Sequence, residues 1–509
     1  MQRKKVFKNA IMSVIQIVTI SIVFFVLYRF LLKVVGVEQI GIWSLVIATT
    51  SITQIANFGL SASIVKFVAK YIAKEEEQNA LIIIQTAAVS IAFFVSIILL
   101  ISYPILKWVL SFVIPSEFLA LSFSLLPFMV VSFWIMSITS IFHAGLDGCQ
   151  RFDLRSSIIM GTSVFDLILA FILAPTFGLL GLAFARLIQN FIVLFASWFL
   201  LRRQFLSAPI IPCRWDKKIF KEIVNYGINF QIMSVAVLSY DFITKALLSR
   251  FGGLFMVGYY EMASKMIQQL RMVIISAAQV LVPVVAELKE RVPKEINNLY
   301  LTLYQIIFYL SLPLYSLIII FSPSISELWI GHYEKIFIIF TIILSLGWFL
   351  NMLAVPAYFI NLGIGDLKWV TIGYLLMVFL SVFLGFIFGA FYGGTGVVIA
   401  ISLSLFLSSS VIYFAYHVKN KIPLIKLLPK SSRMLALACS LDVLATFVIY
   451  KNISSFFTFW QLNILISLLF FIIVFFPLWR HSMRRLIFKW IFVEFLNRDL
   501  NKKTTQWTK

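Results

Sequence analysis

Long apolar segments separated by short polar connections make up almost the whole chain. Most of them run to the roughly twenty residues that an α-helix needs to cross the hydrocarbon core of a membrane. The pattern predicts about fourteen such helices, over residues 10–35, 40–63, 79–103, 118–143, 156–176, 178–201, 223–249, 254–283, 298–322, 336–360, 369–391, 394–416, 434–451 and 459–479. No connection is polar enough to form a separate soluble domain. The pattern therefore predicts an all-α polytopic membrane protein.

Composition excludes the other broad classes. The 509 residues are 61% hydrophobic and only 12% charged, with a mean hydropathy of +1.00. A soluble protein could not cover so much apolar surface. Three cysteines imply no disulfide framework, and four scattered histidines offer no metal cluster. The chain has neither a phosphate-binding loop motif nor a nucleophile–base pattern, so we expect no cofactor, no metal and no enzymatic activity.

Basic residues predict which way the helices run. Most of the 42 Lys and Arg lie in the N-terminal segment, in alternate loops and in the C-terminal tail. The opposite loops hold only Lys33, Lys107, Arg250, Lys335 and Lys451. Positive charge marks the cytoplasmic side of a membrane protein, so an even number of helices with both termini in the cytoplasm is predicted. The net charge of +21 is then a consequence of topology, and nucleic-acid binding is an unneeded explanation.

Glycine motifs recur at a nearly constant spacing. A glycine, a second glycine five positions later and a following aromatic residue appear as Gly36, Gly41 and Trp43, and 217 positions later as Gly253, Gly258 and Tyr260. Gly148 and Gly178 have counterparts in Gly365 and Gly393. Repeats of this kind are typical of secondary transporters, whose substrate sites lie between the halves. We therefore expect six-helix bundles over 1–205 and 206–418, two further helices over 419–480, and a basic amphipathic cytoplasmic tail over 481–509.

The eighth predicted helix carries the longest polar stripe at membrane depth. At 100° per residue, one face of about 100° holds Glu261, Lys265, Gln268, Gln269, Ser276 and Gln279, and Arg271 lies just outside it. Such a stripe cannot face lipid. Two interpretations stay open for Glu261 and Lys265, which either pair locally at i,i+4 or line a hydrated cavity. The glutamines and Arg271 favour the cavity.

Polar residues elsewhere in the predicted helices have simpler alternatives. Gln54 and Asn57 lie on one face of the second helix, where interhelical hydrogen bonds explain them as well as substrate contact does. Arg186 lies deep in the sixth helix, and we expect it to face a cavity. Asp241 and Lys245 form an i,i+4 pair in the seventh helix.

Two carboxyl groups stand alone in the middle of their helices. Asp166 and Asp442 are each open to two interpretations, a proton or cation site or an acid paired with an arginine. Arg186 is one partner available to Asp166. Across all the predicted spans the balance of charge is positive once such pairs are subtracted. A cavity with arginine, amides and hydroxyls suits an anionic, hydroxyl-rich ligand, because arginine matches phosphate oxygens and amides match sugar hydroxyls.

Several motifs resemble one known family. They are Val35-Gly-Val-Glu-Gln-Ile-Gly-Ile-Trp-Ser44, Asn57-Phe-Gly-Leu-Ser61, Lys66-Phe-Val-Ala-Lys70, Gly145-Leu-Asp-Gly-Cys-Gln-Arg-Phe-Asp153 and Gly258-Tyr-Tyr-Glu-Met-Ala263. Together they resemble the polysaccharide-biosynthesis flippases, the Wzx-type O-antigen and oligosaccharide transporters of the MOP superfamily. The resemblance implies two rocking six-helix bundles that enclose a cationic cavity. It also implies transfer of a polyprenyl-diphosphate-linked oligosaccharide across the bacterial cytoplasmic membrane, for surface polysaccharides such as lipopolysaccharide.

On this resemblance, roles can be assigned to the polar residues. Arg186, Lys265 and Arg271 would hold the diphosphate or acidic sugars. Gln268, Gln269, Gln279, Gln54 and Asn57 would contact hydroxyls, and Asp166, Asp241 and Glu261 are candidates for ion coupling. Partners would be the lipid-linked substrate, membrane lipids, and a polysaccharide polymerase with other assembly proteins.

Three alternatives remain. A peptidoglycan-precursor flippase would share the fold and the cationic cavity, and the N-terminal motifs rank it second. A drug or cation antiporter of the same superfamily would have twelve helices, so the last two predicted helices count against it. A membrane scaffold that transports nothing would not need the buried arginines, and a lipid-flip assay in vesicles would separate it from a flippase.

Overall fold

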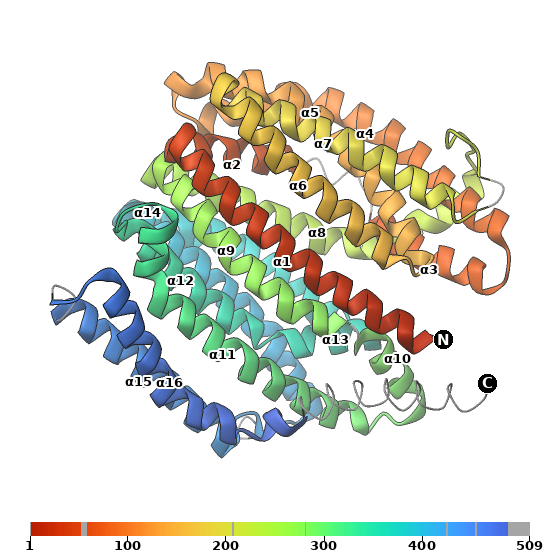
Figure 1. The fold of residues 1–509 in the computed structure, drawn as a ribbon. Coiled ribbons are helices and arrows are strands. Elements are labelled where there is room, and N and C mark those ends of the chain that lie inside the picture. The colour runs from red at the N-terminus through yellow and green to blue at the C-terminus, as the bar shows by residue number, and fades with distance from the viewer. Residues whose placement is uncertain are drawn as a thin grey trace, which may run out of the picture. The chain divides into compact units, whose positions relative to one another are not determined.

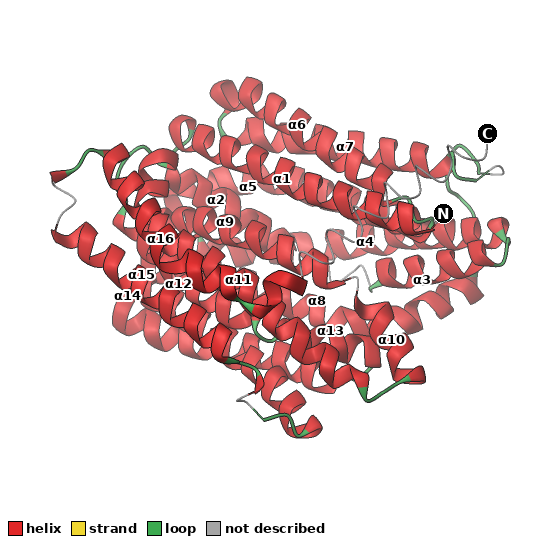
Figure 2. Cartoon of the chain, turned by 60° about the horizontal axis from the view of Figure 1, so that its bottom comes forward, coloured by secondary structure: helices red, strands yellow, loops and turns green. Residues whose placement is uncertain are grey.

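The computed structural model describes residues 2–51, 59–205, 208–279, 281–423, 426–452 and 456–486. These residues are helical almost throughout and contain no strand (Figure 2). Contacts divide the chain into a first unit, Met1–Ala277 with Thr371–Ser408, and a second unit, Ala278–Val370 with Ser409–Lys509. The prediction of an all-α polytopic membrane protein is confirmed.

The first unit contains nine helices in chain order and most of a tenth, among the residues described. They are α1 (Gln2–Val34), α2 (Val37–Ser51), α3 (Leu60–Ala73), α4 (Glu77–Val113), α5 (Ser116–Gly148), α6 (Phe152–Phe177), α7 (Leu179–Arg202), α8 (Lys217–Gly252), α9 (Leu254–Gln279) and residues 371–408 of α14 (Lys368–Asn420). Within this unit α1 lies along α6, and α5 packs against α4 and α7 (Figure 1). Buried residues of α3, α4, α5 and α7, such as Ile64, Ile84, Ile141 and Leu201, form one apolar core.

The second unit is built from the remaining helices. They are α10 (Leu281–Arg291), α11 (Glu295–Trp329), α12 (Lys335–Met352), α13 (Val355–Ile364), α15 (Lys430–Asn452), α16 (Phe459–Arg480) and the last residues of α14. In this unit α15 and α16 lie side by side and pack against α11 (Figure 1). Ser324 of α11 ties them together, because it hydrogen-bonds Tyr450 of α15 at 3.0 Å and Asn463 of α16 at 2.5 Å.

Eleven helices of the described residues are long and apolar enough to cross a membrane. The predicted spans 40–63 and 254–283 are not among these eleven. The first contains residues 52–58 and the second contains residue 280, which lie outside the described residues and separate α2 from α3 and α9 from α10. The spans 369–391 and 394–416 are merged into α14. The count of fourteen stays a prediction.

Helix α14 is two helices that meet at a glycine. Its 53 residues would measure about 80 Å, well over the ~30 Å of a bilayer core. Gly393 interrupts it with φ 63° and ψ −151°, and Gly178, its counterpart between α6 and α7, has φ 58° and ψ −133°. Left-handed backbone of this kind is open to glycine at little cost. The same local break therefore separates the last two helices of both copies of the repeat.

Packing around other glycines also follows the repeat. A β-carbon on Gly148 of α5 would lie 2.7 Å from the β-carbon of Val68, and one on Gly363 of α13 would lie 2.7 Å from that of Val285. Val68 and Val285 are 217 positions apart. The packing therefore pairs Gly148 with Gly363 and not with Gly365, which has φ 84° and ends α13. The repeat spacing shortens by two residues between these sites. The proposed four-part division at 205, 418 and 480 stays a prediction.

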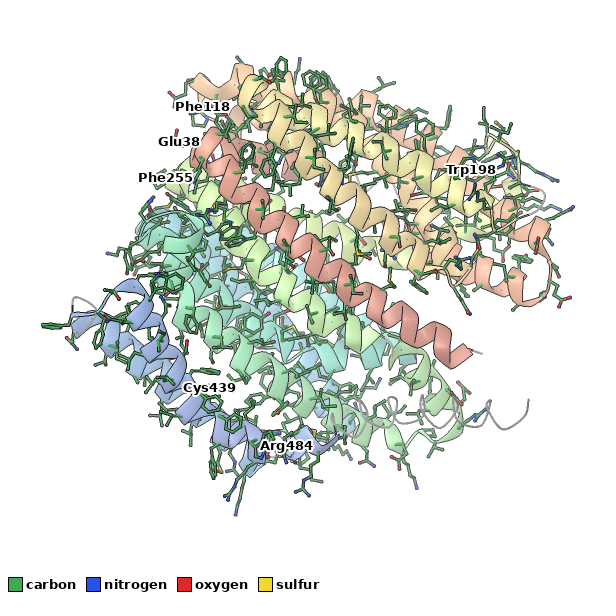
Figure 3. All side chains as sticks on the ribbon, in the orientation of Figure 1. Glu38, Phe118, Trp198, Phe255, Cys439 and Arg484 are labelled. Atoms are coloured by element: carbon green, nitrogen blue, oxygen red, sulfur yellow. The ribbon has the colours of Figure 1, made fainter. Side chains whose placement is uncertain are left out.

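Surface side chains suit a lipid environment. Leu100, Phe195 and Phe391 are large, apolar and exposed on helices long enough to span the membrane. Figure 3 places Glu38, Phe118 and Phe255 at one end of the first unit and Trp198 at the other, as the predicted alternation of loops requires. The protein is therefore a multi-pass membrane protein whose successive helices in this unit reverse direction.

Candidate functional site

The opening turns of α2 and α9 meet at two glycines in the first unit. A β-carbon on Gly41 would overlap the carbonyl oxygen of Leu254, and one on Gly258 would overlap that of Val37. Each glycine therefore touches the residue four positions before the other glycine. This reciprocity is what a two-fold relation between repeat copies produces. Only glycine permits so close an approach of two helix backbones.

Just beyond this crossing, Glu261 of α9 is buried among partners from three other helices. Its carboxylate accepts hydrogen bonds from Ser44 of α2 at 2.9 Å and from Tyr28 of α1 at 3.4 Å. The ammonium group of Lys245 of α8 lies 3.0 Å away, and that of Lys265, one turn along α9, lies 3.8 Å away. The side chains of Lys245 and Glu261 are only 2% and 6% exposed. We call these residues together with Asp241 the Glu261 network.

The network joins two pairs that the sequence predicts separately. Asp241 and Lys245 lie 2.9 Å apart at i,i+4, and Glu261 and Lys265 are the second such pair. Lys245 contacts both carboxylates. Two acids and two bases sum to zero charge, and buried charges are tolerated when they are paired in this way. Asp241 and Lys265 are each 40% exposed, so the network reaches accessible surface at both ends.

Two members of the network escaped sequence reasoning, although a signal for them existed. Ser44 and Glu261 are separated by 217 residues, the spacing of the repeat. Tyr28 and Lys245 are separated by the same number. Each pair therefore occupies one position in two copies of the unit. Comparing the copies position by position would have singled out both residues as counterparts of charged ones, although not their contacts with Glu261.

A second polar cluster joins α6 and α7. The guanidinium of Arg186 donates to Asp166 at 3.1 Å and to Gln189 at 3.0 Å. Gln189 in turn donates to the backbone carbonyl of Thr162 at 3.2 Å. Arg186 is thus the partner of Asp166, and its side chain is still 42% exposed. The arrangement brings together an ion-coupling candidate and a substrate-binding candidate.

Further along α9, after Glu261, lies a row of polar side chains. Lys265, Gln268 and Arg271 are spaced by three residues and rise about 9 Å along the helix. All three, and Gln269, are half-buried, in contrast to the buried Glu261. Gln268 donates to Ser264 at 2.9 Å within the helix. The row carries two cations and two amides on accessible surface.

Arg271 belongs to a polar environment made by three helices of the first unit. Its guanidinium lies within electrostatic reach of Tyr240 on α8 and of Tyr374 on α14. Among the other predicted site residues, Gln54 and Asn57 lie outside the described residues, and so does the side chain of Gln279.

The loop between α5 and α6 is held by ion pairs. Arg151 bonds Asp153 at 3.1 Å and Gln204 at 2.9 Å, and Arg155 pairs with Asp147. Cys149 in this loop is a free thiol, and burial raises its pKa to about 12. The thiol therefore stays protonated and unreactive. No group of three His, Cys, Asp or Glu in the described part of the chain is placed to hold a metal ion.

Three solved structures of membrane transporters resemble this chain. An inward-facing MATE multidrug transporter of the MOP superfamily superposes with a TM-score of 0.68 at 17% identity, covering 81% of this chain and 98% of that one. The lipid II flippase MurJ, inward closed, gives 0.66 at 16% identity and covers 92% of this chain and 97% of its own. A MOP superfamily transporter from Pyrococcus furiosus, described as having a binding pocket of reverse polarity, gives 0.60 at 17% identity over 79% and 95%. The chain therefore shares the fold of these three transporters.

The family follows from the sequence itself. Residues 6–289, more than half of the chain, match the family of polysaccharide biosynthesis proteins. The chain belongs to this family. A comparison with curated proteins finds no match.

Proposed function

We propose that the protein is a flippase for a polyprenyl-diphosphate-linked oligosaccharide destined for a surface polysaccharide. The family and the transporter fold support a membrane flippase. The lipid II flippase supports a lipid-linked substrate, because its fold covers more of this chain than the MATE fold does. Alternating exposure of one cavity to the two leaflets would move the head group while the lipid tail stays in the bilayer.

The polar row of α9 is the observation that carries this proposal. Lys265 and Arg271 would hold the diphosphate, and Gln268 and Gln269 would contact sugar hydroxyls. The Glu261 network is neutral in sum, so Arg271 adds positive charge to this surface. A cationic, amide-rich surface at membrane depth favours an anionic sugar over a cationic drug.

The other predicted site residues have supporting roles in the proposed substrate site or are candidates for ion coupling. Arg186 would add its exposed edge to the substrate surface, and Gln279, Gln54 and Asn57 would supply further amides. Asp166, Asp241 and Glu261 stay candidates for ion coupling, and each already has a cationic partner. An incoming cation would have to displace that partner. Coupling at these acids would therefore require the pairs to break during transport.

The proposal also covers the orientation of the chain in the membrane, its location in the cell and its partners. Both termini would lie in the cytoplasm of a bacterium, with the protein in its cytoplasmic membrane and a polysaccharide polymerase among its partners. Catalysis is no part of the proposed activity. Labelling of single cysteines from either side of the membrane would test the placement of the termini.

The test of the substrate site is translocation in proteoliposomes. A fluorescent polyprenyl-diphosphate oligosaccharide is supplied, and its loss from the outer leaflet is followed with a membrane-impermeant quencher. Lys265→Ala and Arg271→Ala should slow the flip rate, since each removes a cation from the proposed diphosphate site. Arg250→Ala is the matched control, because Arg250 stacks on Phe251 and Phe386 in the last turn of α8, outside the polar row of α9. Parental rates in both test variants would refute the cationic site.

A peptidoglycan precursor is the second candidate, and the lipid II flippase fold favours it. The same vesicles can be loaded with lipid II in place of the oligosaccharide. Faster translocation of lipid II would make the peptidoglycan precursor the substrate. Translocation of neither lipid, together with export of a cationic dye, would point to the antiporter.

A further inference from the structure

The second unit buries a carboxyl group that has no partner among the described residues. Asp442, in the middle of α15, is 0% exposed, and neither of its carboxyl oxygens makes a hydrogen bond. The hydroxyl of Thr446, one turn further on the same face, is also buried and without a hydrogen-bond partner. Buried polar groups in proteins are almost always hydrogen-bonded. A carboxyl group and a hydroxyl group, both buried and both without a hydrogen-bond partner among the described residues, therefore indicate a candidate binding site.

Apolar packing encloses this site on both sides along the helix. One turn before Asp442, Cys439 packs with Val474 of α16 and Leu312 of α11. On the other side Val443 packs against Ile320 of α11 and Ile466 of α16. The packing on either side of Asp442 is therefore apolar, with α11 and α16 as walls.

Among the described residues of the helices packed around Asp442, no basic side chain pairs with its carboxylate. Helix α11 carries only the acids Glu295 and Glu327 as charged residues, and α16 carries only Arg480 at its last position. On α15 itself Arg433 and Lys451 are each nine residues away from Asp442, or about 13 Å.

The other titratable groups on these helices are neutral ones. Cys439 lies within electrostatic reach of Asp442 and beside Ser316 of α11, and its thiol is neutral. Tyr309 and Tyr315 of α11 and Tyr450 of α15 are phenols. His481, which follows α16, bonds Ser432 at 3.0 Å, and burial lowers the pKa of its ring, so it stays uncharged at neutral pH.

We propose that Asp442 is a proton-binding site, occupied when α15 is seated against α11 and α16. An isolated carboxylate in so apolar a place costs far more than the neutral acid, so the group takes up a proton. A metal cation would need more oxygen ligands than the carboxyl group and Thr446 supply. The proton can leave only when α15 moves away from α11 far enough for water to reach the carboxyl group. Proton release at Asp442 is thus linked to the packing of α15, predicted to lie outside the duplicated unit, against α11.

This inference goes beyond the proposed function and does not depend on the transported lipid. Dicyclohexylcarbodiimide is the probe, because it reacts with protonated carboxyl groups in apolar surroundings. The purified full-length protein is treated in lipid vesicles, and the modified peptides are identified by mass spectrometry. Asp442 should be modified, whereas Asp166 and Asp241, paired with Arg186 and Lys245, should not. Label on either ion-paired acid with none on Asp442 would overturn the proposal.

A second measurement covers the case in which the reagent fails to reach the site. Infrared spectra of protein labelled with carbon-13 aspartate should show the carbonyl band of a protonated acid at neutral pH. That band should be lost in Asp442→Asn, which keeps the shape of the side chain, and retained in Asp166→Asn. A carboxylate at Asp442, shown by an unchanged protonated-acid region in Asp442→Asn, would refute the site.

The link to helix packing has its own readout. At alkaline pH the amide hydrogens of α15 should exchange faster in the parental protein than in Asp442→Asn, because only the parental side chain can become charged. At acidic pH the two should exchange alike. Equal exchange at alkaline pH, with the infrared spectrum showing that Asp442 has lost its proton, would refute the link.

Discussion

Glu261 and Asp442 are two equally buried carboxyl groups with opposite surroundings. Glu261 is 5% exposed and has four partners from four helices, and Asp442 is 0% exposed and has none among the described residues. Burial alone therefore does not decide whether an acid inside a membrane protein is charged. The partners decide it, since a nearby ammonium stabilises the carboxylate and an apolar wall stabilises the neutral acid.

The difference follows from where the two acids lie in the fold. Glu261 lies next to the glycine crossing of the duplicated scaffold, where four helices come close enough to supply Lys245, Ser44 and Tyr28. Asp442 lies on α15, whose neighbours α11 and α16 have no basic residue inside the membrane-spanning part. The Glu261 network therefore holds fixed charge, and α15 holds the acid for which we propose a proton site.

Removing the shared cation should produce the largest effect. Lys245→Met leaves Glu261 buried with only the half-exposed Lys265, 3.8 Å away, as a counter-charge, and breaking a buried ion pair costs about 3–5 kcal/mol. The measurement is the thermal melting of the purified protein in detergent. Lys265→Met is the control, because its side chain is 40% exposed and should cost much less. Equal losses in the two variants would contradict the central place of Lys245.

Removing the acid together with the cation should restore part of the loss. In Lys245→Met with Glu261→Gln, no buried charge remains, and the exposed ends Asp241 and Lys265 can reach water. Residues in direct contact typically show a coupling of about 0.5–3 kcal/mol, and we expect the double variant to melt above Lys245→Met alone. Additive losses would show that the two side chains act separately.

Widening the glycine crossing should disturb the network from a distance. Gly258→Val puts a side chain against the backbone of Val37, and such overpacking costs about 1–3 kcal/mol. Gly161→Val is the matched control, because a β-carbon there meets nothing within 4 Å. The melting temperature and the flip rate should both be lower in Gly258→Val than in Gly161→Val. The control reports only the modest effect of the change in helix propensity. Equal losses of melting temperature and flip rate in the two valine variants would show that the close glycine contact does not support the Glu261 network.

Neutralising the unpartnered acid should have the smallest effect. Asp442→Asn replaces a neutral acid by a neutral amide of similar shape, and we expect a change of about 1 kcal/mol or less in stability at acidic pH. Glu261→Gln should cost more in the same melting assay, because it leaves Lys245 without one of its two carboxylates. A large loss in Asp442→Asn would reveal a charged partner and end the contrast between the two acids.

The fold could be predicted from the sequence because membrane-spanning helices produce a strong pattern of apolar segments and basic loops. Apolar segments of spanning length and the alternation of basic loops both reflect the cost of placing charge or open backbone in lipid. The break in α14 at Gly393 was also visible as two spans. Residues 52–58 and 280 lie outside the described residues, so the predicted spans 40–63 and 254–283 stay predictions.

The site was predictable only where contacts are local. Asp241 with Lys245 and Glu261 with Lys265 are one helical turn apart, so spacing alone suggested them. The contact of Lys245 with Glu261 depends on how α8 and α9 pack, which periodicity does not report. Arg186 was expected to face a cavity, and its partner Asp166 was only one option, because a side chain's neighbours on another helix depend on register.

The hydrogen bond between Ser44 and Glu261 has a consequence for the history of the chain. The two residues are the same position in two copies, so in an ancestral homodimer of single units this position would have touched itself across the two-fold axis. A glutamate there would have faced a second glutamate at hydrogen-bonding distance, and the two could not both have been ionised. A hydroxyl suits such a self-contact, whereas a lone carboxylate requires that the two sides differ. Ser44 in one copy and Glu261 in the other are such a difference, which a single fused chain allows because its two copies are free to diverge.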